Sequence, residues 1–469
     1  MAQPLNYCPV RFQALIQPQQ IAVKEEQHAL TYRQLDKQID SLQKQLCLQG
    51  MKTGDRLVCI APNSINLILL QLTCLRSGII FCPLNPRFSD PEIDSRLAIL
   101  NSEFIYLAPE QTRLNLSSLL LNFTAPDNSE FAITQRQIDP LQVINIIFTS
   151  GSSGQAKAAM HHFSNHYYSA LGSQQLIPLR SGDNNLLSLP LFHISGYATV
   201  IRTILAGATV TLSNSPLTVA QLKKLRITHL SLVSTQLTRL LESGEFRQAN
   251  LPVKHLLLGG SAFPAGLLKE TQQRGFNYHL SYGLTEMSSQ VATSSNSSEL
   301  FLLKYRQLRI IEGEIFLRGK TRFAGYFNGL MAGSLIPENQ WFASKDLGNI
   351  VAGSLQITGR KDRMFICGGE NIQPEEIESL LLTLPAIKQA YVVAIKDAAF
   401  GQRPVAFIDC SGEPPQAELD NYLKDKLSRY KRPIHYFLLP AQSGIKVSLK
   451  NLQQLAQARS AEIQFRPPG

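Results

Sequence analysis

The chain has 469 residues, of which 44% are hydrophobic and 17% are charged. These fractions exclude a disordered or low-complexity protein, and the length predicts two or three folded domains. The 45 basic residues outnumber the 35 acidic ones, and the resulting charge of +10 favours polyanionic partners. Because the basic residues are scattered and no aromatic-rich basic motif accompanies them, nucleic acid is not expected as a partner, whereas small polyanions remain candidates.

The cysteines and the apolar segments bear on the compartment. Seven cysteines are widely spaced, mostly inside apolar runs, and none forms a CxxC pair, so neither a disulfide framework nor a zinc site is indicated. The N-terminus lacks a basic segment followed by an apolar one, so no signal peptide is expected. The longest apolar run, residues 67–84, is interrupted by Arg76 and Gly78 and is too short on either side to span a bilayer. We therefore expect a cytoplasmic protein with no membrane partner.

Helical and strand patterns alternate from the N-terminus to about residue 260. Residues 32–46 repeat apolar side chains at helical spacing, and residues 89–100 predict a helix with Ser89 or Asp90 as its cap and Pro91 in its first turn. Apolar segments that read as strands lie at 56–62, 184–192, 208–212, 228–234 and 253–260. Such alternation predicts parallel sheets with helices on their faces.

The pattern changes after about residue 300. Residues 308–319 and 348–359 read as short strands with turns, which predicts a small antiparallel subdomain. A compact α+β pattern then extends to the C-terminus. Its elements are a helix at 374–384, strands at 389–395 and 405–410, and a helix at 418–430. We place the domain boundary near Lys361.

A glycine- and serine-rich loop follows an apolar strand in the segment IIFTSGSSGQAKAAM, residues 146–160. Backbone N–H groups of such a loop can surround phosphate oxygens, and the hydroxyls add donors. The spacing of Gly151, Gly154 and Lys157 does not match the Walker loop, so a P-loop NTPase is disfavoured. Taken alone, the loop fits an exposed Ser/Gly turn better than a phosphate site.

Further motifs follow the loop in a fixed order. They are PLFHISG (190–196), LLGGSAFP (257–264), SYGLTEM (281–287), KDLGNI (345–350), GRKDRMFICGGENIQPEEIE (359–378) and SGIKVSLKN (443–451). This series resembles the ordered motifs of the acyl-adenylate-forming superfamily, which includes acyl-CoA and aryl-CoA synthetases, peptide-synthetase adenylation domains and luciferases. Within the superfamily the motifs, above all GIKVSLKN, are most similar to those of the o-succinylbenzoate–CoA ligase family of the menaquinone pathway.

The pattern and the resemblance together define the expected fold class. We expect a large α/β N-terminal domain, residues 1–360, with two parallel-type sheets flanked by helices and a small antiparallel β subdomain. A small, mobile α+β C-terminal domain, residues 361–469, would follow, with its hinge at Asp362. The resemblance implies ATP, Mg²⁺ and coenzyme A as cofactors and an aromatic dicarboxylic acid as substrate. A homo-oligomer is one possible assembly.

A carboxylate is a poor electrophile, and joining it to the α-phosphate of ATP supplies AMP as a leaving group. This step brings two anions together and so needs cations and donors. The resemblance assigns the β- and γ-phosphates to a loop made of Thr149, Ser150, Gly151, Ser152, Ser153, Gly154 and Lys157. It assigns the α-phosphate to Thr285 and Mg²⁺ to Glu286. In isolation, Thr-Glu would read as a helix cap with a first-turn acid.

The same resemblance implies contacts to the nucleoside. Asp346 would accept hydrogen bonds from both ribose hydroxyls, with Arg360 as a second contact, although an Asp before Gly is usually a turn residue. Tyr282 would stack on adenine. Gly259 and Gly260, which have no side chain, would permit close backbone approach to the base, and Ser281 and Gly283 are further expected cofactor-binding residues.

The C-terminal domain would serve both half-reactions. Lys446 would bridge the substrate carboxylate and the α-phosphate, and Lys450 is the rival assignment, because KVSLKN also reads as a solvated helix face. Motion about Asp362 would then withdraw Lys446, and Gly368 and Gly369 would line a tunnel for the pantetheine arm.

The acid pocket is expected around the second, aromatic carboxylate. Arg202 lies in an apolar helical segment and would pair with this carboxylate, or would extend its head group to solvent. Ser195, Ser288 and Ser289 are further candidates, and His193 either closes one wall of the pocket or is a packed histidine. Three other functions stay open, namely another aryl- or acyl-CoA ligase, an adenylation module that loads a carrier protein, and a non-catalytic nucleotide-binding relative.

Overall fold

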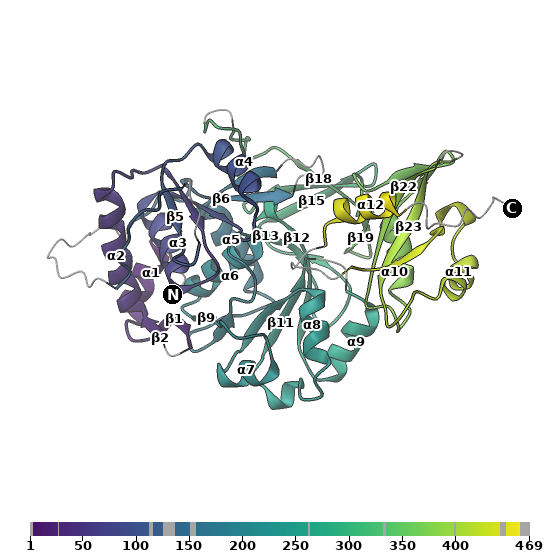
Figure 1. Cartoon of the computed structure of the whole chain (residues 1–469). Coiled ribbons are helices and arrows are strands. Elements are labelled where there is room, and N and C mark those ends of the chain that lie inside the picture. Colours follow the sequence, from purple (N-terminus) through teal and green to yellow (C-terminus); the bar gives the residue numbers. More distant parts are fainter. Residues whose placement is uncertain are drawn as a thin grey trace. The chain divides into compact units, whose positions relative to one another are not determined.

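The structure is a computed structural model of the chain (Figure 1), and it describes residues 3–26, 28–111, 116–124, 137–150, 156–260, 263–331, 334–397, 400–440 and 447–459. Two compact units are present. The first comprises Met1–Gly260, Arg274–Leu308 and Leu317–Phe342, and the second comprises Ser261–Gln273, Arg309–Phe316 and Ala343–Gly469. The boundary expected near Lys361 and the hinge at Asp362 stay predictions.

The larger sheet of the first unit has nine strands in the described part of the chain. Their order is β14-β13-β12-β11-β10-β8-β9-β1-β2. The strands are β1 (Ile21–Glu25), β2 (His28–Thr31), β8 (Asn184–Leu186), β9 (Thr209–Leu212), β10 (His229–Leu232), β11 (His255–Gly259), β12 (Tyr278–Leu284), β13 (Ser289–Thr293) and β14 (Phe301–Leu302). Neighbouring strands pair in parallel from β12 through β11, β10, β8 and β9 to β1. The pairs β1–β2, β12–β13 and β13–β14 are antiparallel.

The second sheet of this unit has the order β17-β7-β6-β4-β3-β5. Its strands are β3 (Arg56–Ile60), β4 (Ile80–Leu84), β5 (Ile105–Leu107), β6 (Val143–Ser150), β7 (Ala156–His162) and β17 (Gly325–Phe327). Strands β3 to β6 pair in parallel, whereas β6–β7 and β7–β17 are antiparallel. The two parallel-type sheets are therefore confirmed, with antiparallel edges that the sequence pattern does not predict.

Helices in the first unit follow the expected periodicity. They are α1 (Pro9–Ile16), α2 (Tyr32–Leu48), α3 (Ile65–Ser77), α4 (Asp90–Leu100), α5 (Phe163–Ser173), α6 (Ile194–Leu205), α7 (Val219–Lys224) and α8 (Ser234–Leu241), with short 3₁₀ turns η1 (Gln248–Asn250) and η2 (Thr285–Met287). Helix α4 begins after Ser89, whose backbone N–H donates to Glu92, so Ser89 rather than Asp90 is the cap.

The apolar run at residues 67–84 forms most of helix α3 and strand β4, and both are buried in the core. Arg76 within it is fully buried, and its guanidinium pairs with Asp36 at 2.5 Å and with Asp40 at 2.6 Å, which compensates the burial of the charge. Among the described residues, no helix is long and apolar enough to cross a membrane.

The second unit contains the compact α+β elements expected at the C-terminus, together with elements that precede them in the chain. They are α9 (Ala265–Gln273), β18 (Phe342–Val351), β19 (Ser354–Arg360), β20 (Phe365–Cys367), β21 (Glu370–Ile372), α10 (Pro374–Leu381), β22 (Gln389–Asp397), β23 (Gly401–Asp409), α11 (Gln416–Lys424), η3 (Arg429–Lys431), β24 (Tyr436–Leu438) and α12 (Leu449–Ala458). Strands β22, β23 and β24 form one sheet. The predicted small antiparallel sheet has the order β15-β16-β18-β19, with β15 (Arg306–Ile311) and β16 (Glu314–Gly319) each crossing the division between the units.

Candidate active site

The glycine- and serine-rich loop connects the hairpin formed by β6 and β7. Strand β6 is buried through Val143 to Ile147, as its apolar sequence predicts, and Thr149 pairs in register with Lys157 on β7. The predicted phosphate-binding residues Gly151, Ser152, Ser153 and Gly154 lie outside the described residues, as does the side chain of Ser150. The structure therefore places the two ends of the predicted loop, Thr149 and Lys157, opposite each other.

The SYGLTEM motif forms the end of β12 and the turn η2. Gly283 lies at a bulge between β12 and β13, and a Cβ atom there would come within 2.1 Å of the Ser289 carbonyl oxygen, so only glycine fits. Thr285 and Glu286 are half-buried on η2. Ser288 ends the turn with a φ of 53°. A single short turn thus carries both the predicted α-phosphate residue and the predicted Mg²⁺ ligand.

Two neighbouring segments hold the Glu286 side of this turn. The hydroxyl of Tyr326, on β17, donates to Oε1 of Glu286 at 2.5 Å, and the backbone N–H of Phe323 donates to the Glu286 carbonyl at 2.9 Å. The Lys157 ammonium lies 5.1 Å from the centre of the Tyr326 ring, within cation–π range. Lys157 and Tyr326 also line an open cavity of about 330 Å³ together with Ala98, Asn328 and five neighbouring residues.

A buried polar chain holds the Thr285 side of the turn. His161 Nε2 lies 2.8 Å from the Thr285 carbonyl oxygen, so this nitrogen must carry the proton. His161 Nδ1 then accepts from the Asn145 amide nitrogen at 3.0 Å, and Asn145 Oδ1 accepts from His166 Nε2 at 2.8 Å. Burial lowers the pKa of His161 to about 4 and that of His166 well below its usual value, so both rings are neutral.

Arg202 on α6 is buried, and neutral groups surround its guanidinium. Nη2 donates to Thr199 Oγ1 at 2.7 Å, and Nη1 donates to Gln290 Oε1 at 3.3 Å. Burial lowers the pKa of Arg202 to about 10. Within the described residues, no carboxylate pairs with this cation. A buried cation without an anion is unfavourable on its own, so the position favours an anionic ligand.

A hydrogen-bonded series connects Arg202 to the SYGLTEM motif. Gln290, which accepts from Arg202, donates to Thr293 Oγ1 at 3.1 Å, and Thr293 in turn donates to Ser281 Oγ at 3.3 Å. The structure therefore links the predicted acid-pocket residue Arg202 to the predicted cofactor-binding residue Ser281 through side chains from β13.

The remaining acid-pocket candidates differ in their surroundings. His193 precedes α6 and packs edge-on against Phe192, and Ser195 is half-buried in the first turn of this helix. The Ser288 hydroxyl is fully buried and donates to the Thr321 carbonyl at 2.9 Å, so its donor already has a backbone partner. Ser289 is half-buried, with a φ of 96°.

Residues predicted beside the adenine lie on neighbouring strands. Gly259, at the end of β11, pairs in register with Ser281 on β12, and Gly260 follows with a φ of 92°. Tyr282 is half-buried next to Ser281. Because these residues lie at the carboxyl ends of parallel strands, they occupy the edge where α/β sheets bind ligands.

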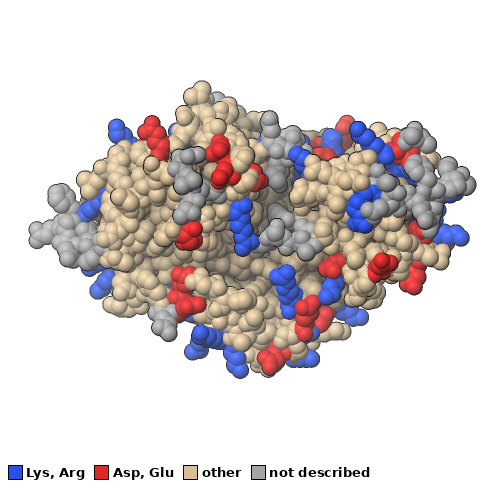
Figure 2. All heavy atoms as spheres, in the orientation of Figure 1, with Lys and Arg blue, Asp and Glu red and all other residues tan. Residues whose placement is uncertain are grey.

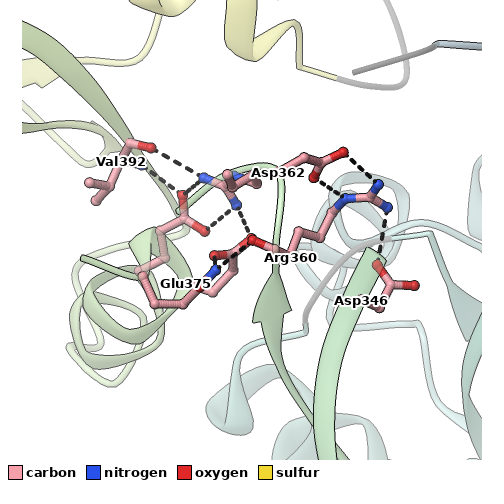
Figure 3. A network of polar contacts seen from close by, with 8 residues as sticks. Asp346, Arg360, Asp362, Glu375 and Val392 are labelled. Carbon is pink, nitrogen blue, oxygen red and sulfur yellow. Dashed lines mark hydrogen bonds and ion pairs between the residues drawn. The ribbon is translucent and has the colours of Figure 1, made fainter. Parts of the chain in front are cut away.

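In the second unit, Asp346 and Arg360 face each other across the β18–β19 pair (Figure 3). Arg360 Nη1 lies 3.0 Å from Asp346 Oδ1, and the same guanidinium makes two contacts with Asp362, at 2.9 Å from Nε and 3.1 Å from Nη2. Asp346 is buried whereas Arg360 is partly exposed. The predicted ribose acceptor and the predicted hinge residue thus share one arginine.

Arg363, the residue after Asp362, pairs with different elements from those that Arg360 contacts. Arg363 pairs with Glu378 at 2.6 Å and with Glu375 at 2.8 Å, both on helix α10 (Figure 3). Glu378 Oε1 also accepts from the backbone N–H of Val392 on β22 at 2.7 Å. Burial raises the pKa of the Glu378 carboxyl, and the Arg363 guanidinium opposes this shift. These contacts fix the chain after Asp362 to α10 and β22.

Gly368 and Gly369 connect strands β20 and β21. Their φ angles are 59° and 89°, and two consecutive positive φ values are typical of the tight hairpin turn that favours glycine at both central positions. A Cβ atom at Gly368 would also come within 2.9 Å of the Phe400 ring. The turn accounts for both glycines, and the pantetheine tunnel stays a prediction.

The two lysines of the GIKVSLKN motif differ in what the structure shows. Lys446 lies outside the described residues. Lys450 is exposed in the first turn of α12, which begins after Ser448, and the Ser448 hydroxyl accepts from the Asn451 N–H at 3.3 Å. This is the position expected for a solvated helix residue.

The surface mixes both signs of charge. Figure 2 shows Lys and Arg interspersed with Asp and Glu on the visible face.

All seven cysteines are free. In the described part of the chain, no cluster of three or more His, Cys, Asp or Glu side chains could hold a metal ion by itself.

Sequence reasoning did not identify His161, Asn145, Gln290 or Tyr326. His161 is 124 residues from Thr285, and Tyr326 is 40 residues from Glu286, so neither contact has a local signal. The two consecutive histidines of AAMHH place polar side chains beside an apolar strand segment, but they do not show which residues these side chains contact.

Comparison with known proteins identifies the class. Residues 10–327 match the family model described as AMP-binding enzyme, and residues 376–443 match the AMP-binding enzyme C-terminal domain. The chain belongs to the AMP-binding enzyme family.

Individual relatives narrow the similarity. The chain is 32% identical to 2-succinylbenzoate–CoA ligase of Escherichia coli K12 over 455 residues, which is 96% of this chain and 98% of the relative. It is 30% identical to the enzyme of the same name from Bacillus cereus Q1, over 95% of this chain and 97% of the relative. Among solved structures, an arginine-to-lysine variant of E. coli MenE with bound OSB-AMS superposes with a TM-score of 0.84 at 31% identity, covering 98% of this chain and 100% of that one. The Bacillus subtilis o-succinylbenzoate CoA synthetase in complex with ATP and magnesium ion gives 0.84 at 27% identity, covering 96% and 99%.

Proposed function

We propose that this protein is an ATP-dependent 2-succinylbenzoate–CoA ligase that acts in menaquinone biosynthesis. The aliphatic carboxylate of the acid attacks the α-phosphate of ATP, and pyrophosphate leaves. The coenzyme A thiol then attacks the acyl carbonyl of the resulting adenylate, and AMP leaves, giving 2-succinylbenzoyl-CoA. The family, the named relatives and the residues of the candidate site support this reaction. The free cysteines are consistent with the cytoplasmic location that we also propose.

The observation that carries the substrate assignment is the buried guanidinium of Arg202. It contacts only the neutral side chains of Thr199 and Gln290 in the described part of the chain. The substrate has a second carboxylate, on its aromatic ring, that the chemistry does not consume. An ion pair between this carboxylate and Arg202 would neutralise both charges in a site that excludes water. A monocarboxylic aryl acid would leave Arg202 without a partner.

The other residues have roles in the first half-reaction. Lys157 and the loop after Thr149 bind the β- and γ-phosphates, and Thr285 binds the α-phosphate. Asp346 accepts hydrogen bonds from the ribose hydroxyls, and Arg360 orients the Asp346 carboxylate. Lys446 supplies a further positive charge near the reacting carboxylate, and motion about Asp362 exchanges it for the Gly368–Gly369 turn in the second half-reaction.

The carboxylate of Glu286 is a suitable ligand for Mg²⁺. It is half-buried, one oxygen accepts from Tyr326, and no cationic side chain pairs with it within the described residues. Hard oxygen ligands of this kind are those that Mg²⁺ prefers. When bound with ATP, the ion would neutralise phosphate charge in the site.

A pair of acids tests the substrate assignment. 3-Benzoylpropionate has the same keto acid chain as 2-succinylbenzoate and lacks only the ring carboxylate. We expect kcat/KM for CoA-ester formation to be at least about 100-fold higher with 2-succinylbenzoate, because the acid without the ring carboxylate leaves Arg202 unpaired. Arg202→Gln should remove most of this preference while KM for ATP changes little. Equal use of the two acids by the unaltered protein would contradict the assignment and favour another aryl-CoA ligase.

An adenylation module that loads a carrier protein makes a different prediction about the acyl acceptor. Faster loading of a phosphopantetheinyl protein than of free coenzyme A would support that module. We expect free coenzyme A to be the better acceptor.

A further inference from the structure

Tyr326 has no role in the reaction described above, yet it contacts two residues that do. Its hydroxyl donates to Oε1 of Glu286 at 2.5 Å, and its ring lies under the Lys157 ammonium at 5.1 Å. Both contacts lie within the first unit, and Tyr326 reaches them because β17 pairs with β7, the strand that follows the loop. A single side chain therefore connects the predicted Mg²⁺ ligand to the lysine of the predicted phosphate loop.

The geometry leaves the two oxygens of Glu286 in different states. Oε1 is engaged by Tyr326, and no described side chain pairs with Oε2. A hydrogen bond from a hydroxyl to a carboxylate is charge-assisted and therefore stronger than one between two neutral groups. It also restricts rotation of the Glu286 side chain. The Phe323 N–H fixes the Glu286 backbone from the same segment, at 2.9 Å. Side chain and backbone of Glu286 are thus oriented together.

We propose that Tyr326 is a positioning residue for metal–nucleotide binding, which rests on the proposed function of Glu286. By holding Oε1, Tyr326 presents Oε2 to a divalent cation in one orientation. Mg²⁺ requires near-ideal octahedral geometry, so its affinity depends strongly on the direction of each ligand oxygen. Removing partners that orient metal ligands typically weakens metal affinity by about 10- to 100-fold.

The ring of Tyr326 has a second effect that can be separated from the first. Lys157 rests on the ring face, which restrains the ammonium beside the open cavity that both residues line. Phenylalanine keeps this face and loses the hydroxyl, whereas leucine loses both. The two substitutions therefore distinguish the metal effect from the phosphate effect.

The test measures Mn²⁺ binding by electron paramagnetic resonance in the presence of α,β-methylene-ATP, a non-hydrolysable analogue. We expect Tyr326→Phe to weaken Mn²⁺ binding about 10-fold or more, without changing the affinity for the analogue in EDTA. Tyr326→Leu should weaken both. Tyr391→Phe is the matched control, because its half-buried hydroxyl donates at 3.2 Å to the neutral Gln389 in the second unit, and it should change neither.

A double-mutant cycle identifies the route of the effect. If Tyr326 acts through Glu286, Tyr326→Phe should have no further effect on Mn²⁺ affinity in the Glu286→Gln background. Unchanged Mn²⁺ affinity in Tyr326→Phe, or an equal additional loss in the Glu286→Gln background, would overturn the proposal. Absence of acid-dependent adenylation in the unaltered protein would instead overturn the proposed function, and this readout is independent of the comparison between variants.

Discussion

His161 donates from Nε2 to the backbone carbonyl of Thr285 at a distance of 2.8 Å. The donor comes from the strand that leaves the predicted phosphate loop, and the acceptor belongs to the turn that carries the predicted α-phosphate residue. Because His161 Nδ1 faces the Asn145 amide nitrogen, the ring is fixed in the neutral form protonated at Nε2. This hydrogen bond therefore ties η2 to the β6–β7 hairpin.

Removing this donor should impair the adenylation step. We expect His161→Met to lower the rate of acid-dependent ATP–pyrophosphate exchange about 10-fold or more, because the Thr285 carbonyl keeps only the Ser288 N–H of its two donors and the turn can shift. His161→Gln keeps an amide N–H at a similar position and should retain activity within about threefold. Equal activities for the methionine and glutamine variants would show that the donor is irrelevant.

Asp346 should determine nucleotide affinity more than Asp362 does, although both contact Arg360. A carboxylate that accepts both ribose hydroxyls makes charge-assisted hydrogen bonds, so Asp346→Asn should weaken ATP binding by about 10- to 100-fold. Asp362→Asn should change it by less than about threefold, because it weakens a partly exposed ion pair with Arg360 and removes no proposed contact to the nucleotide. Isothermal titration with α,β-methylene-ATP measures both. A larger effect at Asp362 would be incompatible with these roles.

Lys446 and Lys450 can be separated by assaying the two half-reactions independently. Lys446→Ala should lower acid-dependent pyrophosphate release about 100-fold or more, because the charge that stabilises the adenylation transition state is lost. The same variant should convert synthetic 2-succinylbenzoyl-AMP and coenzyme A to product at close to the normal rate. Lys450→Ala should leave both steps intact, as expected for an exposed residue of α12. The opposite pattern would reassign the lysine.

A row of histidines on β10, β11 and β12 should make stability sensitive to acid. His229 stacks on His255 at 5.1 Å, and His255 Nδ1 lies 2.9 Å from His279 Nε2. Burial lowers the pKa of His229 and of His279 from 6.5 to about 4. As pH falls below 6.5, these histidines become protonated in the unfolded chain but stay neutral in the folded protein. Their contribution to the free energy of unfolding is therefore fully present above pH 6.5 and is lost progressively down to about pH 4.

Urea unfolding at pH 7.5, 6.0 and 5.0 measures this effect. We expect the row to account for a loss on the order of 1 to 3 kcal/mol between the first and last pH. His229→Gln keeps a donor for the Pro178 carbonyl and should reduce the pH dependence, whereas His28→Asn, at an exposed position, should not. An identical slope in all three proteins would exclude the row as the cause.

The strand and helix segments were predictable where periodicity is strong. The apolar segments at 228–234 and 253–260 form β10 and β11, and Ser89 caps α4, because local propensity and burial agree there. The antiparallel edges were not predictable, since the apolar pattern of β7 and β13 does not show that each runs opposite to its neighbour. Periodicity reports which face is buried and does not report strand direction.

The candidate site was predictable in its ordered motifs and not in its supports. Arg202 could be named as a candidate because a single arginine in an apolar helix needs a partner, and Glu286 could be named because it lies in a contiguous motif. The contacts from His161 to Thr285 and from Tyr326 to Glu286 join residues far apart in sequence, and such pairs are determined only when the sheets assemble. Gly368 and Gly369 show a further limit, because their turn geometry explains them without reference to coenzyme A.

Acid-dependent exchange of radiolabelled pyrophosphate into ATP, measured in the absence of coenzyme A, tests the central claim most directly. Reversible formation of an acyl-adenylate predicts exchange that requires both 2-succinylbenzoate and Mg²⁺ and proceeds without the thiol. A folded protein that shows no exchange with 2-succinylbenzoate, or that exchanges only when coenzyme A is added, would contradict the account.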